Sequence, residues 1–232
     1  MDLIGDAFAE AWRLLSTGDG DVYGIMTRTL VITGTSTLLA MLIGVPVGLL
    51  LALGQFPGQR MLVAFSYAGM GMPPVVAGLV VAILLWRSGP LGQLGLIYTP
   101  GAIVIAQTLI ATPVIIAVTS TGVMALPPPL RLQIRAMGAG DGTYLWLVAR
   151  EARLPLLVAM MAGFGAVVSE VGASTVVGGN LAGETRVLTT AAVLEMSKGN
   201  FGTALALGLI LLAIVLAVGM VLAALLHRMR RI

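Results

Sequence analysis

The amino-acid sequence predicts an all-α integral membrane protein with about five transmembrane helices. The composition supports this, because 58% of the 232 residues are hydrophobic and only 10% are charged, whereas a soluble domain carries about a quarter charged residues. The apolar residues also gather in long runs, and the 30 glycines are typical of helices that pack closely in lipid. We therefore expect one integral membrane domain.

The N-terminal segment, residues 1–24, predicts an interfacial helix followed by a linker. Ala7, Phe8, Ala11 and Trp12 recur at helical spacing, with charged residues on the opposite side. No basic segment precedes an uninterrupted apolar core, so the pattern differs from that of a cleaved signal peptide. The remaining residues, 25–232, are expected to form the transmembrane domain.

Hydropathy predicts five spans in this domain, each close to the roughly 20 residues that cross the hydrocarbon core of a bilayer. They cover residues 30–53, 62–85, 102–124, 156–177 and 203–226. Prolines lie inside or beside three of these spans, at Pro46, Pro73, Pro74 and Pro113. A proline lacks a backbone N–H, and lipid tolerates this only where neighbouring helices or a cavity satisfy the freed carbonyl group. We expect kinked helices that line a pathway.

The basic residues of the connections predict the orientation, because Lys and Arg accumulate in cytoplasmic loops. The larger group lies on one side and comprises Arg60, Arg131, Arg135, Arg150, Arg153, Arg228, Arg230 and Arg231. The smaller group comprises Arg13, Arg28, Arg87, Arg186 and Lys198. We therefore expect a multi-pass protein of the cytoplasmic membrane, with its N-terminus outside and its C-terminus in the cytoplasm.

Several functions are excluded by what the sequence lacks. The net charge of +3 comes from scattered residues rather than a basic stripe with aromatic residues, so nucleic-acid binding is not expected. The sequence contains no cysteine, and His227 is its single histidine, so no metal site built from these residue types is expected. ATP hydrolysis would need a phosphate-binding loop that ends in Gly-Lys-Ser/Thr. The single lysine, Lys198, lies on the predicted outer side and outside such a motif. We expect no enzyme activity and no cofactor bound by this chain.

The connection 125–155 is the longest on the predicted cytoplasmic side. It opens with three prolines at 127–129 and contains a glycine-rich turn at 138–142. A second segment of helix-forming residues follows, and Pro155 begins the next span. The pattern predicts helix, turn and helix, a surface pair that can seat a soluble partner.

Glu170 is the one carboxylate at predicted bilayer depth. An ionisable residue there costs at least ~2.5 kcal/mol, so a role in a transport pathway is one interpretation. The preferred alternative is structural, because a negative charge would repel an anionic substrate. In that case Glu170 is protonated or bonded to backbone and hydroxyl groups, and it fixes a kinked helix.

The outer connection between the last two spans contains further candidates for a substrate pathway. Glycine-rich turns beside hydroxyl groups could present backbone N–H groups to an oxyanion, and the alternative is a solvated loop. The hydroxyl group of Thr112 could line a path, or it could bond to a helix carbonyl. The pathway candidates are Thr112, Ser169, Glu170, Gly178, Gly179 and Asn180.

Two groups of motifs carry a resemblance to a known family. The first group comprises Gly71-Met72-Pro73-Pro74, Arg87-Ser88-Gly89-Pro90 and Ile105-Ala106-Gln107. The second group comprises Ser169-Glu170-Val171-Gly172-Ala173, Gly178-Gly179-Asn180 and Thr185-Arg186. In these motifs and their order the chain resembles the ABC-type tungstate and molybdate permeases, and the second group resembles the tungstate branch in particular.

The resemblance implies a type I ABC importer permease fold, like that of the molybdate permeases, and the import of an oxyanion, with tungstate the first choice. It implies a homodimer of this chain, two cytoplasmic ATPase subunits that bind ATP and Mg, and an external oxyanion-binding protein. The two permease copies would alternate between inward-open and outward-open arrangements in the lipid membrane.

Members of this family carry a cytoplasmic coupling loop with Glu-Ala-Ala, then Gly after three residues, then Leu-Pro. Gly138-Ala139 and Leu154-Pro155 match this motif, whereas Leu132-Gln133-Ile134 stands in place of Glu-Ala-Ala. The resemblance implies that the loop docks in a groove of the ATPase. The residues assigned to coupling are Arg135, Gly138, Ala139, Asp141, Leu154 and Pro155.

Alternatives from other classes stay open at this point. A secondary transporter would be expected to show internal repeats and a charged coupling site near the midplane, and Glu170 is the only such feature in the sequence. A channel, and a membrane scaffold without transport activity, are two further alternatives. Within the preferred family, molybdate or sulfate competes with tungstate as the substrate.

Overall fold

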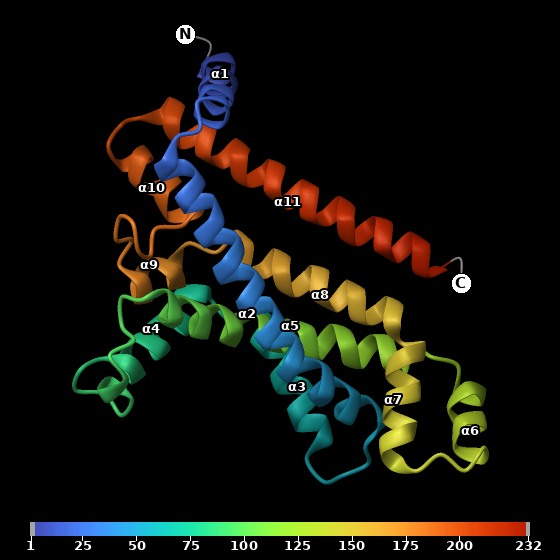
Figure 1. The fold of residues 1–232 in the computed structure, drawn as a ribbon. Helices are drawn as coiled ribbons and strands as arrows, with labels where there is room; N and C mark the ends of the chain where they lie inside the picture. The colour runs from blue at the N-terminus through green and yellow to red at the C-terminus, as the bar shows by residue number, and fades with distance from the viewer. Residues whose placement is uncertain (1–2, 231–232) are drawn as a thin grey trace.

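The computed structural model describes residues 3–230, and the side chains of residues 5–228. All regular structure in this part of the chain is helical (Figure 1). Residues 1, 2, 231 and 232 lie outside it, and so do the side chains of Arg230 and Arg231, which entered the orientation prediction.

Within residues 3–230, three helices are long and apolar enough to cross a membrane. They are α2 (Gly20–Leu53), α5 (Pro100–Met124) and α11 (Phe201–Arg230). They confirm the first, third and fifth predicted spans. Helix α2 begins well before residue 30 because the Asp19 side chain caps it, accepting hydrogen bonds from the N–H groups of Asp21 and Val22.

The second predicted span is not one continuous helix. Helices α3 (Gln59–Met70) and α4 (Pro74–Leu85) are bent by 105° at the short break between them. Two consecutive prolines cause the break, because neither supplies a backbone N–H and the residue before a proline avoids helical geometry. Pro74 instead occupies the first turn of α4, where a helix tolerates proline.

The fourth predicted span is also interrupted. Helix α8 (Arg153–Val168) ends before residue 177, and the short α9 (Gly172–Gly178) follows after a break at 169–171. Hydropathy misses this break because the residues on both sides of it are apolar. With the bent pair of α7 (Asp141–Glu151) and α8, which meet at 71°, and the pair of α3 and α4, the structure offers up to five spans.

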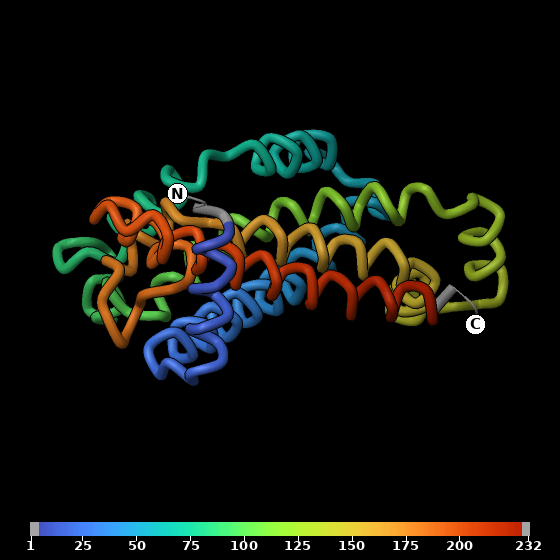
Figure 2. Tube along the Cα trace, turned by 90° about the horizontal axis from the view of Figure 1, so that it is seen from above, coloured from blue at the N-terminus to red at the C-terminus, as the bar shows by residue number. Residues whose placement is uncertain are grey.

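The two ends of the molecule carry different short elements, as Figure 2 shows. At one end, here called the loop end, lie α1 (Leu3–Ser16), η1 (Gly92–Leu94), α9 and α10 (Leu188–Ser197). At the other, the coupling end, lie α6 (Pro128–Ala136) and α7. Helix α1 and the last turns of α11 lie at opposite ends, as an odd number of spans requires.

Helix α1 has one face packed on the rest of the protein and one face exposed. Ala11 and Leu14 share a buried cluster with Leu207 and Ile210 of α11. Trp12, by contrast, is 74% exposed. The apolar residues of the predicted interfacial helix therefore divide between contacts with α11 and an open surface.

Helices α2, α5 and α8 form the centre of the bundle, and small residues let them approach closely. A Cβ atom added at Gly48 of α2 would lie 2.7 Å from Cβ of Thr119, and one at Gly44 would lie 2.8 Å from Ile115. Gly163 of α8 packs against the same isoleucine. This close packing of glycine against side chains is how helices gain contact energy in lipid, where the hydrophobic effect between them is small.

The contact between α4 and α9 is tighter still, and it yields a stability prediction. A Cβ atom at Gly78 would lie 2.5 Å from Cα of Ala173, a backbone atom that cannot rotate away. We expect Gly78→Ala to lower the free energy of unfolding by about 1–3 kcal/mol, as overpacking does. Thermal unfolding of the purified protein in detergent measures this change.

Gly165→Ala is the matched control, because a Cβ atom there meets nothing within 4 Å. Alanine in this helical position should leave stability unchanged or raise it by up to about 1 kcal/mol. Equal unfolding temperatures for Gly78→Ala and the unmodified protein would show that α4 and α9 are not in close contact.

Candidate functional site

The break between α8 and α9 is organised by the side chain of Glu170. Its carboxylate accepts hydrogen bonds from the N–H groups of Ala173 (2.7 Å) and Ser174 (2.9 Å), the first donors of α9. The Ser174 hydroxyl donates to the same carboxylate at 3.0 Å. Glu170 is only 6% exposed. These are the bonds to backbone and hydroxyl groups that the structural interpretation of this residue predicts, and they stabilise the start of α9.

The backbone on both sides of this break also bonds to side chains from other helices. Gln107 of α5 donates through Nε2 to the Val167 carbonyl (3.4 Å) and to the Ser174 hydroxyl (3.3 Å). The hydroxyl of Ser36 in α2 lies 3.1 Å from Gln107 Oε1, and Thr189 donates to the Glu170 carbonyl at 3.0 Å. The network therefore joins α2, α5, α8, α9 and α10.

Thr112 and Ser169, the two pathway candidates with hydroxyl groups, make local hydrogen bonds. Thr112 donates to the Thr108 carbonyl at 2.6 Å, and it lines an apolar groove of about 360 Å³ between α3 and α5 with Gly69 and Pro113. Ser169 is exposed and donates to the Gly165 carbonyl at 3.2 Å. Both hydroxyls thus make the local bonds that threonine and serine commonly make in helices. Their part in a pathway stays a prediction.

The connection 178–187 folds into a compact loop at the loop end. Gly179 and Asn180 both adopt left-handed backbone geometry, with φ of 70° and 52°. The Thr185 hydroxyl donates to the Gly178 carbonyl at 2.6 Å and accepts from the Leu181 N–H at 2.8 Å. The N–H groups of residues 184–188 also donate within the chain. Few N–H groups of this loop are therefore left for an oxyanion.

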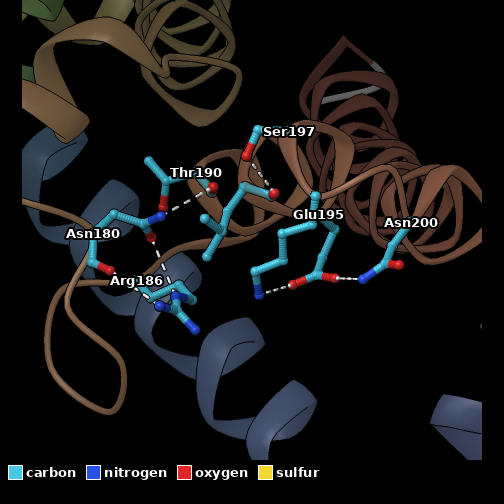
Figure 3. A network of polar contacts seen from close by, with 8 residues as sticks. Asn180, Arg186, Thr190, Glu195, Ser197 and Asn200 are labelled. Carbon is cyan, nitrogen blue, oxygen red and sulfur yellow. Dashed lines mark hydrogen bonds and ion pairs between the residues drawn. The ribbon is translucent and has the colours of Figure 1, made fainter.

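Charged side chains hold this loop and the helix after it (Figure 3). Arg186 donates through Nε to Asn180 Oδ1 and through Nη2 to the Asn180 carbonyl, both at 3.3 Å. In α10, Glu195 accepts from Asn200 (2.7 Å) and Lys198 (2.8 Å). The pKa of Glu195 lies below its ordinary value, chiefly because Asn200 donates to the carboxylate, and then because of Lys198 and Arg186.

At the coupling end, α6 and α7 meet at a turn through Gly138, which has φ of 81°. Arg135 pairs with Asp141 at 3.1 Å, and its guanidinium lies 4.2 Å from the ring centre of Tyr144. Ala139 packs on the buried cluster formed by the ends of α2, α5, α6 and α7. The predicted helix, turn and helix is what the structure has between residues 128 and 151.

The remaining coupling candidates, Leu154 and Pro155, lie in the first turn of α8 rather than at the turn. They line an apolar groove of about 470 Å³ with Tyr67 and Gly122, and the Pro155 ring packs directly on Gly122. The structure thus places these two residues at the junction of the surface pair with the bundle, and Arg135, Gly138, Ala139 and Asp141 around the turn.

Some residues of the site were not among the sequence candidates. In the sequence, Gln107 stands out only as part of a family motif, with no role of its own. Arg28 stands out only among the basic residues that predict the orientation. A glutamine inside an apolar run is a signal that could have been used, because a buried amide needs hydrogen-bond partners. No sequence signal connects Arg28 of α2 to the loop 178–187, which it contacts across more than 150 residues.

Comparison with known proteins decides the family. The family described as "Binding-protein-dependent transport system inner membrane component" matches residues 44–231. The chain belongs to this family. It is thus an ABC importer permease, a multi-pass subunit of the inner membrane, and its relatives are pore-forming components rather than enzymes.

Three similar sequences cover most of this permease. A "probable anion ABC transporter permease protein" of Haloferax volcanii is 40% identical over 84% of this chain and 86% of its own. The "tungstate uptake system permease protein TupB" of Peptoclostridium acidaminophilum is 36% identical over 95% and 97%. The TupB protein of Campylobacter jejuni is 31% identical over 92% and 90%.

Solved structures agree on the fold of the permease. An inward-facing conformation of the MetNI methionine ABC transporter matches with a TM-score of 0.72 at 21% identity, over 87% of this chain and 92% of that one. An amino acid ABC transporter crystallised with histidines matches with a TM-score of 0.63 at 18% identity, over 95% and 98%. The predicted type I importer fold is confirmed.

The cap on α9 gives a testable consequence for stability. Glu170→Ala would leave the N–H groups of Ala173 and Ser174 without their acceptor inside the protein. We expect a loss of about 1–3 kcal/mol for each donor left unpaired, and a smaller loss for Glu170→Gln, which keeps one acceptor oxygen. Thermal unfolding in detergent measures both variants.

Glu184→Ala is the control, because this carboxylate is exposed in the same part of the molecule. Its unfolding temperature should match that of the unmodified permease. If Glu170→Ala unfolds at the same temperature as Glu184→Ala, the carboxylate does not stabilise the break.

Proposed function

We propose that this chain is the permease subunit of an ATP-driven importer that carries an oxyanion, with tungstate as the substrate, across the cytoplasmic membrane. The observation that carries the proposal is 36% identity to a tungstate uptake permease over 95% of the chain. The similarity to a probable anion permease also supports a negatively charged substrate. The region around Glu170 and the loop 178–187 lies within the part of the chain that these relatives match.

Molybdate is the second candidate substrate. Molybdenum permeases named ModB in two mycobacteria are 25% identical over 90% of this chain. A sulfate permease of Synechocystis reaches 26% over 87%. The higher identity to the tungstate permeases makes tungstate the first choice. Since a pathway must release its ion, most of the selection among these oxyanions belongs to the external binding protein.

The complete transporter would contain two copies of this chain, two ATPase subunits that bind ATP and Mg, and an external oxyanion-binding protein. The surface of the coupling end supports the ATPase contact. Leu132, Met137 and Trp146 are 69%, 81% and 60% exposed there. A docked ATPase subunit would cover these apolar side chains. The arginines of α6 and α7 at this end support the orientation with the coupling end and the C-terminus in the cytoplasm.

Coupling would be mechanical. Closure of the ATPase subunits on ATP moves the turn at Gly138, and the buried cluster of Tyr144, Val148 and Ile134 transmits the motion to α2 and α5. The breaks at 71–73 and 169–171 divide the spans into shorter rigid helices. Such helices can rock between inward-open and outward-open arrangements as packed bodies.

ATP hydrolysis by the reconstituted complex tests this function. The chain is purified with its ATPase, and hydrolysis is measured with the binding protein empty or loaded with tungstate, molybdate or sulfate. We expect the tungstate-loaded protein to give the greatest stimulation. Equal stimulation by molybdate or sulfate would change the substrate, and the absence of any associated ATPase would overturn the importer.

Substitution of Gly138 tests the docking assignment. Gly138→Asp adds charge and bulk at an open position, where an added Cβ atom meets nothing within 4 Å. The fold and membrane insertion should therefore survive, while stimulated ATP hydrolysis should fall by about ten-fold or more, equivalent to about 1.4 kcal/mol of lost contact.

Gly18→Asp is a closely matched control at the other end of the molecule. Gly18 also has a positive φ, of 69°, and open space around its Cα atom. Both substitutions carry the same backbone strain, since aspartate tolerates this region only moderately. Normal stimulated hydrolysis in Gly138→Asp, or an equal loss in Gly18→Asp, would contradict the docking of this turn on the ATPase.

A further inference from the structure

Two arginines at the loop end are held by backbone and amide oxygen atoms. Arg28 of α2 donates through Nη1 to the Gly183 carbonyl at 2.8 Å and through Nε to the Arg186 carbonyl at 3.3 Å. Arg186 in turn donates to the side-chain and backbone oxygens of Asn180 (Figure 3). Arg28 therefore holds the backbone of Arg186, whose own side chain is held by Asn180.

Neither guanidinium is neutralised by these contacts. The ion pairs found in the described part of the chain are Glu10 with Arg13, Asp141 with Arg135, and Glu195 with Lys198. Carbonyl oxygens orient a guanidinium but carry no net charge, and each guanidinium has more N–H donors than the two that are used here. Both arginines are half-buried, so solvent screens their charges less than on an open surface.

Glu184 and Glu195 lie in the same segment of the chain as Arg186, and neither removes this positive charge. Glu195 is close enough to Arg186 for that charge to lower its pKa, but its oxygens are bound by Lys198 and Asn200. Glu184 is exposed and forms no ion pair with either arginine. Arg28 and Arg186 therefore keep charges that no ion pair of the described residues cancels, and two other carboxylates of this end, Asp19 and Asp21, lie at the start of α2.

The loop that carries Arg186 covers the ends of the central helices. A Cβ atom at Gly178 would lie 2.7 Å from Ile103 of α5. The N–H of Leu188 donates to the Thr29 hydroxyl of α2 at 2.9 Å. The loop thus bridges α2, α5 and α9, which the network of Gln107 and Glu170 also joins.

We propose that Arg28 and Arg186 form a receiving site for a tetrahedral oxyanion at the outer end of the permease. The planar fork of a guanidinium matches the oxygen atoms of such an ion in pairs, and hydrogen bonds between charged groups are about twice as strong as neutral ones. Because the carbonyl contacts fix both side chains beforehand, little ordering is needed on binding. This inference rests on the proposed function, and it assigns the ion to guanidinium groups rather than to backbone N–H groups.

Glutamine substitutions test the site in the complete transporter. The complex with the ATPase, carrying Arg28→Gln or Arg186→Gln, is reconstituted in liposomes and supplied with tungstate-loaded binding protein. Glutamine keeps an amide that can donate to the carbonyls but removes the charge. We expect the maximal uptake per ATP hydrolysed to fall about ten-fold, from the loss of one charge-assisted contact. The half-saturating concentration of binding protein should not change.

Arg87→Gln is the control, because Arg87 is an exposed arginine near the same end of the molecule. Its uptake should equal that of the unmodified transporter. Arg28→Lys and Arg186→Lys separate charge from loop geometry, since lysine keeps the charge but loses the paired contacts. We expect both lysine variants to transport more than the glutamine variants.

Three outcomes would overturn the receiving site. Unchanged uptake in the glutamine variants would remove the role of both arginines. Lysine variants as inactive as the glutamine variants would mean that the arginines only order the loop. A raised half-saturating concentration with normal maximal uptake would mean that they contact the binding protein instead. An unmodified complex that imports no oxyanion would overturn the proposed function itself, which is a separate result.

Discussion

The hydrogen bonds of the Glu170 carboxylate to the start of α9 are the interaction on which the arrangement of the bundle depends. A helix that stops inside a membrane leaves N–H and C=O groups that lipid cannot satisfy. Here the carboxylate accepts hydrogen bonds from N–H groups of α9. Gln107 donates to the Val167 carbonyl, and Thr189 donates to the Glu170 carbonyl. Glu170 lies in the break itself, whereas Gln107 comes from α5 and Thr189 from α10. The polar groups at the break are therefore satisfied by one local side chain and by two side chains from other helices.

The two breaks in the spans have different physical causes. Between α3 and α4 the covalent structure of two prolines interrupts the helix. Between α8 and α9 no proline is present, and hydrogen bonds satisfy the interruption. The Glu170 carboxylate makes local ones to Ala173 and Ser174, while Gln107 and Thr189 make tertiary ones. The first break is therefore a property of the local sequence, whereas the second combines a local cap with contacts of the assembled fold.

This difference explains how far the sequence could be interpreted. The composition and the apolar runs were sufficient for the all-helical membrane class and for α2, α5 and α11. The glycine-rich turn between α6 and α7 was also readable, since a positive φ at Gly138 is what glycine allows at a helix end. Pro73 and Pro74 were visible as possible kinks, but the bend of 105° was not. Glu170 pointed to a kinked helix at 169–171, but the bonds of Gln107 and Thr189 to this break, and those of Arg28 to the loop 178–187, join residues far apart in sequence, and no local pattern contains them.

The length of α2 has a consequence for the membrane around the protein. Its apolar stretch, residues 30–53, would extend about 36 Å at about 1.5 Å per residue, against about 30 Å of hydrocarbon. The stretch is therefore long enough to span such a bilayer with some tilt. Because α2 is packed along α5 over glycines, tilting it carries the centre of the bundle with it. A mismatch between this stretch and the bilayer therefore acts on the centre of the bundle rather than on one helix alone.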